Sequence, residues 1–166
     1  MIHKLIKSFE QISALPTASA HCDIPCKIYD PSTAQIAALT IVRMMDLIAE
    51  LDAGGNASDP IVLNNLSRFI AAKEEHGIKV KDEIRIIWGD YFKQPQLEAF
   101  PEIHDLTHQI MLLASACKQS IDREKAIALI DAVNRFAEIF WATKDVKVKK
   151  ATCPYPPALE MVYPDL

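Results

Sequence analysis

The sequence has little that would build a β-rich, disulfide-bonded or membrane-spanning protein. Only four of its 166 residues are glycine, so the tight turns that join many short strands are scarce. Four cysteines are too few for a disulfide scaffold in a chain that is 50% hydrophobic and can bury its own core. No apolar run approaches the roughly 20 residues that a membrane span needs. We therefore expect a single helical domain in a reducing compartment, with a cytoplasmic location and no membrane partner.

Positive charge is not arranged as nucleic acids require. The formal net charge is −4, and the basic residues form no stripe interleaved with aromatic side chains. The short basic run from Lys147 to Lys150 is interpreted as a solvated helix end. We therefore expect no nucleic-acid partner.

The sequence does contain four apolar stripes at helical spacing. Asp30-Pro31 and Asp59-Pro60 each place a capping aspartate before a proline at the first helical position, and Pro101 and either Ser120 or Asp122 introduce two further helices. The stripes are Ala37, Ile41, Met44, Ile48 and Leu51; Val62, Leu66, Phe69, Val80, Ile84, Ile87 and Trp88; Ile103, Leu106, Ile110, Leu113 and Cys117; and Leu129, Val133, Phe136 and Phe140. This pattern predicts an all-α, antiparallel four-helix bundle.

Some segments do not follow the helical period. Gly54-Gly55-Asn56 ends the first stripe, and the segment from Asp90 to Pro95 breaks the second. The polar run Lys73-Glu74-Glu75-His76 is either a solvated stretch or a buried polar site. The Pro-rich end, residues 151–166, is expected to be an extended tail that packs on its own bundle or on a neighbouring subunit.

The first twenty residues form a separate segment. They end in Ala18-Ser19-Ala20, an A-x-A pattern that is typical of a cleavage site. Because polar residues interrupt the apolar middle, the segment fits an amphipathic pro-segment better than an export signal. We expect a protease to cut after Ala20, which divides the chain into a pro-segment (1–20), a hook and helical bundle (21–150) and the tail (151–166).

A compact set of metal donors follows the expected cut. The hook His21-Cys22-Asp23-Ile24-Pro25-Cys26 holds two thiols and an imidazole, and cleavage would add the free amine of His21. Its C-x3-C spacing differs from the C-x2-C of zinc knuckles. From the residues alone, structural or redox-inert cysteines remain an alternative.

The hook and three later blocks together resemble the nickel superoxide dismutase family. The later blocks are Trp88-x-Asp90-Tyr91-Phe92-Lys93-x-Pro95, Phe100-Pro101-Glu102-x-His104 and Ile139-Phe140-Trp141-x-Thr143-Lys144. The resemblance covers about residues 21 to 145. It implies an enzyme that converts superoxide into dioxygen and hydrogen peroxide, with one nickel ion per subunit of a homohexamer.

The resemblance also implies how nickel is bound. The His21 amine, the Cys22 amide nitrogen and the sulfurs of Cys22 and Cys26 would form a plane, with the His21 imidazole as an axial ligand of Ni(III). Strongly donating thiolate and amide ligands stabilise Ni(III), whereas zinc cannot change oxidation state. A non-catalytic nickel or zinc carrier that uses the same hook is the alternative function.

Further residues have roles implied by the family. Asp23 and Tyr29 would line the approach to the metal, and Tyr91 would reach it from a neighbouring subunit; Pro25 matches a cis-proline. The sequence departs from the family at two positions, where a glutamate and an arginine that steady the axial imidazole align with Ala37 and His76. Either His76 takes over the orientation of His21, or the imidazole is held less firmly.

Other candidate ligands are expected to be structural. The pair His104 and His108 superficially matches a zinc-protease motif but lacks its glutamate, so we interpret it as an exposed pair without a metal. Cys117 is expected in the core, and Cys153 has no nearby His or Cys partner in the tail. Trp88 packs the bundle and is also a candidate wall of the metal site.

Overall fold

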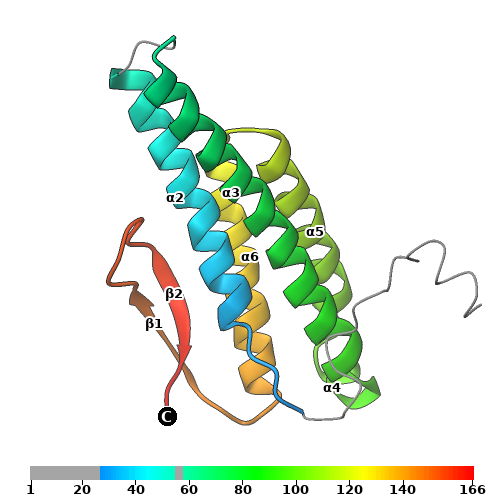
Figure 1. The fold of residues 1–166 in the computed structure, drawn as a ribbon. Helices are drawn as coiled ribbons and strands as arrows, with labels where there is room; N and C mark the ends of the chain where they lie inside the picture. Colours follow the sequence, from blue (N-terminus) through cyan, green and yellow to red (C-terminus); the bar gives the residue numbers. More distant parts are fainter. Residues whose placement is uncertain (1–26, 55–57) are drawn as a thin grey trace, which may run out of the picture.

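In the part of the chain that the structure describes, four long helices pack together and a two-stranded sheet lies on one side of them (Figure 1). The computed structural model describes residues 27–54 and 58–166. The long helices are α2 (Ser32–Gly54), α3 (Pro60–Ile86), α5 (Ile103–Gln119) and α6 (Arg123–Ala142). Each long helix packs against two others, in the cyclic order α2, α3, α5, α6. The predicted four-helix bundle is confirmed.

Aspartate side chains cap three of the helices as the sequence predicts. Asp30 Oδ1 accepts a hydrogen bond from the Ser32 amide at 2.7 Å, and Asp59 Oδ1 accepts one from the Ile61 amide at 2.8 Å. Of the two candidates for the last helix, Asp122 is the cap, accepting from the Glu124 and Lys125 amides. Each cap satisfies amides that the helix leaves unpaired and contributes about 1 kcal/mol.

Most of the core is formed by residues of the predicted stripes, but Val62, Leu66 and Phe69 of α3 are only partly buried and the register of α2 is shifted. Fully buried side chains include Ile41, Val80, Ile84, Ile110, Cys117, Val133, Phe136 and Phe140. On α2, however, Met45 is buried, whereas Met44 is only half-buried. The reason is that α2 contacts both α3 and α6, so its buried face is wider than a single stripe. No helix in the two described ranges is both long and apolar enough to cross a membrane.

The connection from α3 to α5 contains structure that the sequence did not indicate. Helix α3 widens at its end into a π turn, η1 (Ile87–Tyr91), which is followed by the short helix α4 (Gln94–Ala99). The ring of Phe92 is buried against Phe136, with the ring centroids 5.6 Å apart. The extra residue of a π turn changes which side chains face inward. Here it brings Tyr91 and Phe92 to the end of the bundle core.

The C-terminal segment is a β-hairpin. Strand β1 (Val148–Thr152) pairs antiparallel with β2 (Glu160–Pro164), and Lys150 lies opposite Val162. The prediction of a helix end at Lys147 to Lys150 is therefore wrong. Helix α6 ends at Ala142, and Asp145 then adopts a left-handed backbone conformation with φ of 56°. The boundary expected after residue 150 falls inside β1.

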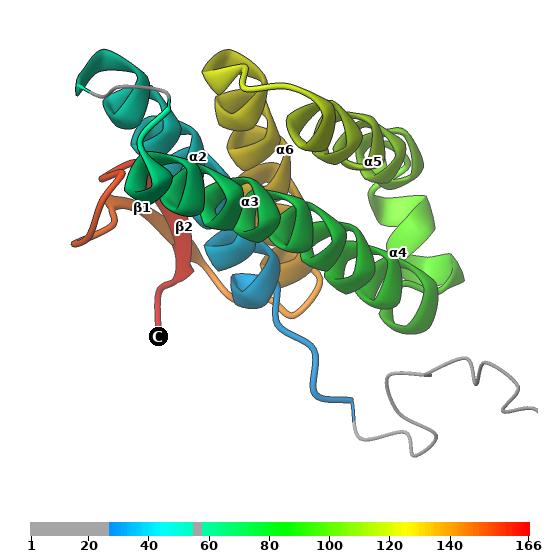
Figure 2. The same ribbon diagram turned by 45° about the horizontal axis from the view of Figure 1, so that its top comes forward.

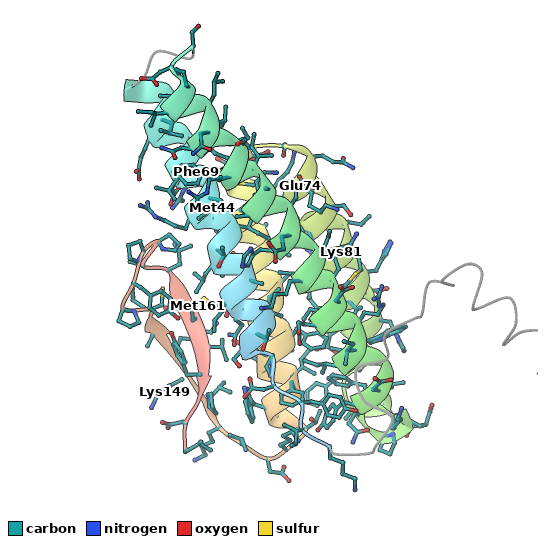
Figure 3. The ribbon with its side chains drawn as sticks, in the orientation of Figure 1. Met44, Phe69, Glu74, Lys81, Lys149 and Met161 are labelled. Carbon is teal, nitrogen blue, oxygen red and sulfur yellow. The ribbon has the colours of Figure 1, made fainter. Side chains whose placement is uncertain are left out.

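The hairpin packs on the bundle of its own chain. Figures 1 and 2 show it on the opposite side of the bundle from α5, and Figure 3 shows Met161 facing α2 while Lys149 points away. The buried Gln35 side chain donates to Val162 O at 2.9 Å and to Asn134 Oδ1 at 3.0 Å. The Asn134 amide group donates to Glu160 O, and its oxygen accepts from the Val162 amide. These side chains satisfy the backbone groups of the inner edge of β2.

Part of the polar run on α3 is a buried polar site. Lys73 is only 2% exposed, and its ammonium group donates to the carbonyl oxygens of Cys117, at 2.7 Å, and of Lys118. These carbonyls belong to the last turn of α5, whose helix leaves them unpaired. Glu74 provides the counter-charge at 3.3 Å. Lys73 thus caps α5, while Glu75 is exposed, so the two alternatives each hold for part of the run.

Candidate metal centre

The proposed nickel ligands lie at the N-terminal side of the described chain. His21, Cys22 and Cys26, together with Asp23 and Pro25, fall outside the described residues, as does the expected cleavage site after Ala20. The described chain begins at Lys27 and leads into α2. Figure 1 shows this beginning at the same end of the bundle as α4 and the start of the hairpin segment. The residues near Lys27 are the described residues that follow the hook directly in the sequence.

Tyr29 and Tyr91 meet at this end of the bundle. Their ring centroids are 5.7 Å apart, and the Tyr91 ring also packs on Phe140 at 4.8 Å. The resemblance implies that Tyr91 reaches the site from a neighbouring subunit, whereas in this structure it contacts Tyr29 of its own chain. The π turn accounts for this contact, because Tyr91 is its last residue.

The Tyr91 hydroxyl is held by the end of α6. It lies 2.6 Å from Thr143 Oγ1, and the Thr143 hydroxyl donates to the Phe140 carbonyl, also at 2.6 Å. Since the Thr143 proton is engaged by that carbonyl, Tyr91 is the donor in the first bond. A threonine hydroxyl has one proton and two acceptor sites, so both bonds form together. Tyr91 therefore has a fixed position beside Tyr29.

A cation lies over the same aromatic cluster. Lys144 Nζ is 4.8 Å from the centroid of the Tyr91 ring and 5.1 Å from that of Phe140. An ammonium group over an aromatic face is attracted by the ring's negative face. No role was predicted for Thr143 or Lys144 from the sequence. The only signal was their place in the Trp-x-Thr-Lys block next to Trp141.

The cysteines of the described chain are unsuited to bind a metal. Cys117 is fully buried, as predicted, and burial raises the pKa of its thiol to about 11, so it remains protonated near neutral pH. Cys153 is also buried, and its thiol donates to the Tyr155 carbonyl at 3.3 Å. Within residues 27–54 and 58–166 no group of three His, Cys, Asp or Glu side chains could hold a metal ion. Thiolate ligands would have to come from Cys22 and Cys26.

The histidines have other partners. His104 Nδ1 accepts a hydrogen bond from Trp88 Nε1 at 3.1 Å, and the two rings meet edge to face. His104 and His108 are both exposed, as predicted for this pair. His76 is partly buried, and its Nδ1 lies 2.8 Å from the Ala72 carbonyl of its own helix. Ala37 is buried in the core, so its methyl group cannot orient an imidazole.

Comparison with known proteins identifies the family. The model of a family described as nickel-containing superoxide dismutase matches residues 16–144. The chain belongs to this family. It is therefore an enzyme of the superoxide dismutase class with nickel as its cofactor. The matched range contains the hook, the tyrosine pair and Lys144, but it ends before the hairpin.

Characterised relatives and solved structures agree with this assignment. The chain is 34% identical to the nickel superoxide dismutase of Streptomyces coelicolor over 77% of this chain and 91% of the relative. It is 33% identical to that of Streptomyces seoulensis over 76% and 89%. A native nickel superoxide dismutase structure superposes with a TM-score of 0.66 at 32% identity, covering 75% of this chain and 99% of that one. An apo structure gives 0.63 at 30% identity, covering 71% and 98%.

Proposed function

We propose that the chain dismutes superoxide at a nickel ion bound by His21, Cys22 and Cys26. The observation that supports these ligands most strongly is the donor chemistry of the hook. Two thiols, an imidazole and a potential terminal amine lie in a single short segment of a nickel-enzyme sequence. The other two thiols, those of Cys117 and Cys153, are buried in the bundle and hairpin.

The donor set fits the metal and its reaction. The thiolates of Cys22 and Cys26 with the amine and amide nitrogens would hold nickel, and their strong donation would make Ni(III) accessible. Bound nickel supplies a one-electron couple that oxidises one superoxide and reduces a second. In total, two superoxide ions and two protons give one dioxygen and one hydrogen peroxide.

The tyrosine pair is proposed to control the approach to this metal. Tyr29 follows Cys26 by three positions, so it remains close to the hook. The ring of Tyr91, the last residue of the π turn, packs against the ring of Tyr29. Their phenol groups would limit access to small ions and hold them near the open face. Asp23 lies inside the hook and would line the same approach.

Lys144 adds a positive charge to this approach. Its ammonium group lies over Tyr91 and is exposed, so it can attract a small anion before the anion reaches the tyrosine pair. A cation beside a narrow entrance raises the local concentration of anionic substrate, and this effect weakens with salt. Lys144 would therefore act on the association of superoxide rather than on the metal.

We further propose that the chain is a precursor and that its processed form is a cytoplasmic homohexamer. The family match begins at residue 16, so the family model itself includes residues upstream of His21. This supports a leader that a protease removes by cutting after Ala20. The hexamer and the location rest on the family resemblance and on the lack of a disulfide framework.

One experiment tests the ligand and the processing proposals together. Nickel content, superoxide decay and the paramagnetic signal of Ni(III) are measured for the full chain and for the chain that starts at His21. We expect only the trimmed chain to give a Ni(III) signal with axial nitrogen splitting and rapid decay of superoxide. Tight nickel binding without that signal or that decay would instead identify a carrier.

A further inference from the structure

The C-terminal hairpin lies beyond the part of the chain that matches the family. The family match ends at residue 144, and β1 begins at Val148. The match to a native nickel superoxide dismutase structure covers 99% of that chain but only 75% of this one. The hairpin is thus a feature that the family match does not account for, and its contacts indicate what it adds to this chain.

Gln35 joins the first turns of α2 to both α6 and the hairpin. Its side chain is 6% exposed, and its amide group donates to Asn134 Oδ1 on α6 at 3.0 Å and to the Val162 carbonyl on β2 at 2.9 Å. Both protons of the glutamine amide group are thereby used. The Asn134 oxygen also accepts from the Val162 amide, and its amide group donates to the Glu160 carbonyl. We call this network of two side chains and the β2 backbone the clasp.

Apolar packing between the hairpin and the beginning of α2 is incomplete. A cavity of about 110 Å³ lies between them, and its lining includes Ser32 and Ile36 of α2 and Tyr155 and Tyr163 of the hairpin segment. Ile36 is 55% exposed and Tyr155 is 46% exposed. Because the two surfaces do not fill the space between them, dispersion contacts contribute less here than in the core. The hydrogen bonds of the clasp therefore carry a large part of the contact between the hairpin and α2.

The clasp lies one helical turn from the point where α2 meets the segment that leads to the hook. The Gln35 backbone amide donates to the Pro31 carbonyl at 3.0 Å, and Asp30 caps the same turn. Lys27 has a left-handed backbone with φ of 59°, a conformation that a residue with a side chain keeps only where its surroundings hold it. The chain thus has a defined course from the clasp to Lys27, which follows the hook directly.

We propose that Gln35 is a positioning residue for the nickel site and that the hairpin acts through it. This inference rests on the proposed binding of nickel by the hook. In a chain that begins at His21, the hook has a single covalent attachment to the protein, the segment that follows Cys26. Its placement beside Tyr29 therefore depends on how firmly the first turn of α2 is held. The clasp supplies that hold without contributing a ligand to the metal.

Three variants separate this role from a general effect on stability. The test variant is Gln35→Met, which keeps the length of the side chain and removes both donors. Lys149→Met is the hairpin control, because it removes the exposed ion pair with Asp165 at 3.0 Å and leaves the clasp intact. Lys73→Leu is the stability control, because it removes the donor to the last carbonyls of α5.

The first measurement needs no metal. Hydrogen exchange of the backbone amides at positions 32 and 35, which are bonded to Asp30 and Pro31, is followed by NMR in the metal-free full-length chain. We expect Gln35→Met to speed this exchange about tenfold, because the first turn opens locally once its side-chain bonds are lost. Both controls should keep the wild-type rates at these two positions.

The second measurement concerns the metal in the chain that begins at His21. We expect Gln35→Met to bind nickel about tenfold more weakly and to broaden the axial nitrogen splitting of Ni(III), while both controls keep the wild-type values. If Gln35→Met does not fold, Asn134→Ser, which leaves the bond from Gln35 to Val162 in place, is measured with the same expectation.

The possible results distinguish this inference from the proposed function. Wild-type exchange in the test variant, faster exchange with unchanged nickel binding and splitting, or an equal loss in either control would each overturn the role of Gln35 and leave the proposed function intact. A wild-type chain that binds no nickel when it begins at His21 would overturn both.

Discussion

The hydroxyl of Tyr91 lies 2.6 Å from that of Thr143, and this bond joins the π turn to the end of α6. It connects two segments that are 52 positions apart in the sequence and fixes the ring beside Tyr29. The position of a proposed site residue is thus determined by a residue on a different helix.

Replacement of either hydroxyl should test this bond. We expect Tyr91→Phe and Thr143→Val each to lower the free energy of unfolding by about 1 kcal/mol, the usual net contribution of a hydrogen bond. Chemical denaturation of both single variants and of the double variant gives the coupling between them. If the two effects simply add, the hydroxyl groups do not interact in solution.

The hook cysteines should differ from the buried ones. In the trimmed chain, Cys22→Ser and Cys26→Ser are each expected to abolish the Ni(III) signal and the decay of superoxide, because a serine hydroxyl is not ionised at neutral pH and donates weakly. Cys153→Ser and Cys117→Ala are the controls and should keep both properties. Survival of activity in either hook variant would show that the ligand assignment is wrong.

Activity of the trimmed chain should require that it begins at His21. A chain with one extra residue before His21 is expected to fold with an unchanged unfolding temperature but to lack superoxide dismutation, because its amine would be displaced from the metal plane. The comparison is made with the chain that begins at His21. Equal rates in the two forms, or in the full-length chain with Ala20 still attached, would contradict amine ligation.

Lys73 should be important for stability although no role at the metal is proposed for it. Lys73→Leu keeps the apolar stem but leaves the Cys117 and Lys118 carbonyls without their donor. Unsatisfied buried acceptors cost about 1 to 3 kcal/mol each, so we expect a loss of at least about 2 kcal/mol in the free energy of unfolding. The exposed Lys79→Leu on the same helix is the control and should change it by less than about 0.5 kcal/mol.

Cys117 should make stability fall at alkaline pH. Its thiol has a pKa of about 11 in the folded chain against 9.0 for the unperturbed group, so the folded state disfavours the thiolate. This contribution is constant below pH 9 and is lost as the pH rises from 9 toward 11, by up to about 1.4 kcal/mol per pH unit. The difference in unfolding free energy between the wild-type chain and Cys117→Ala should therefore change over this window. A constant difference would contradict the shift.

Local signals in the sequence predicted the helices well. Asp30, Asp59 and Asp122 act within three residues of their own positions, and helical periodicity directly indicates which faces become buried. The hook could be proposed from the sequence because its donors are neighbours there. Its geometry is not among the described residues, so the ligands remain a proposal.

Features that depend on distant partners could not be predicted. The five residues of β1, Val148–Thr152, have no alternation of buried and exposed positions, and the hairpin is held by Gln35 and Asn134 from two separate helices. The sequence left open whether Lys73 belongs to a solvated stretch or to a buried polar site, and only the carbonyl groups of α5 decide between them. In the same way, nothing near Tyr91 in the sequence indicates its bond to Thr143.

The bond from Gln35 to Val162 also bears on when the fold can close during synthesis. These residues are 127 positions apart, so Val162 leaves the ribosome long after Gln35 does. Because chains emerge from the N-terminus, the first turns of α2 must wait for the hairpin before they are fastened. Gln35 lies only nine positions after Cys26. The start of α2, into which the hook leads, is therefore held in place only after the hairpin has been synthesised, and we expect acquisition of the metal to follow that step.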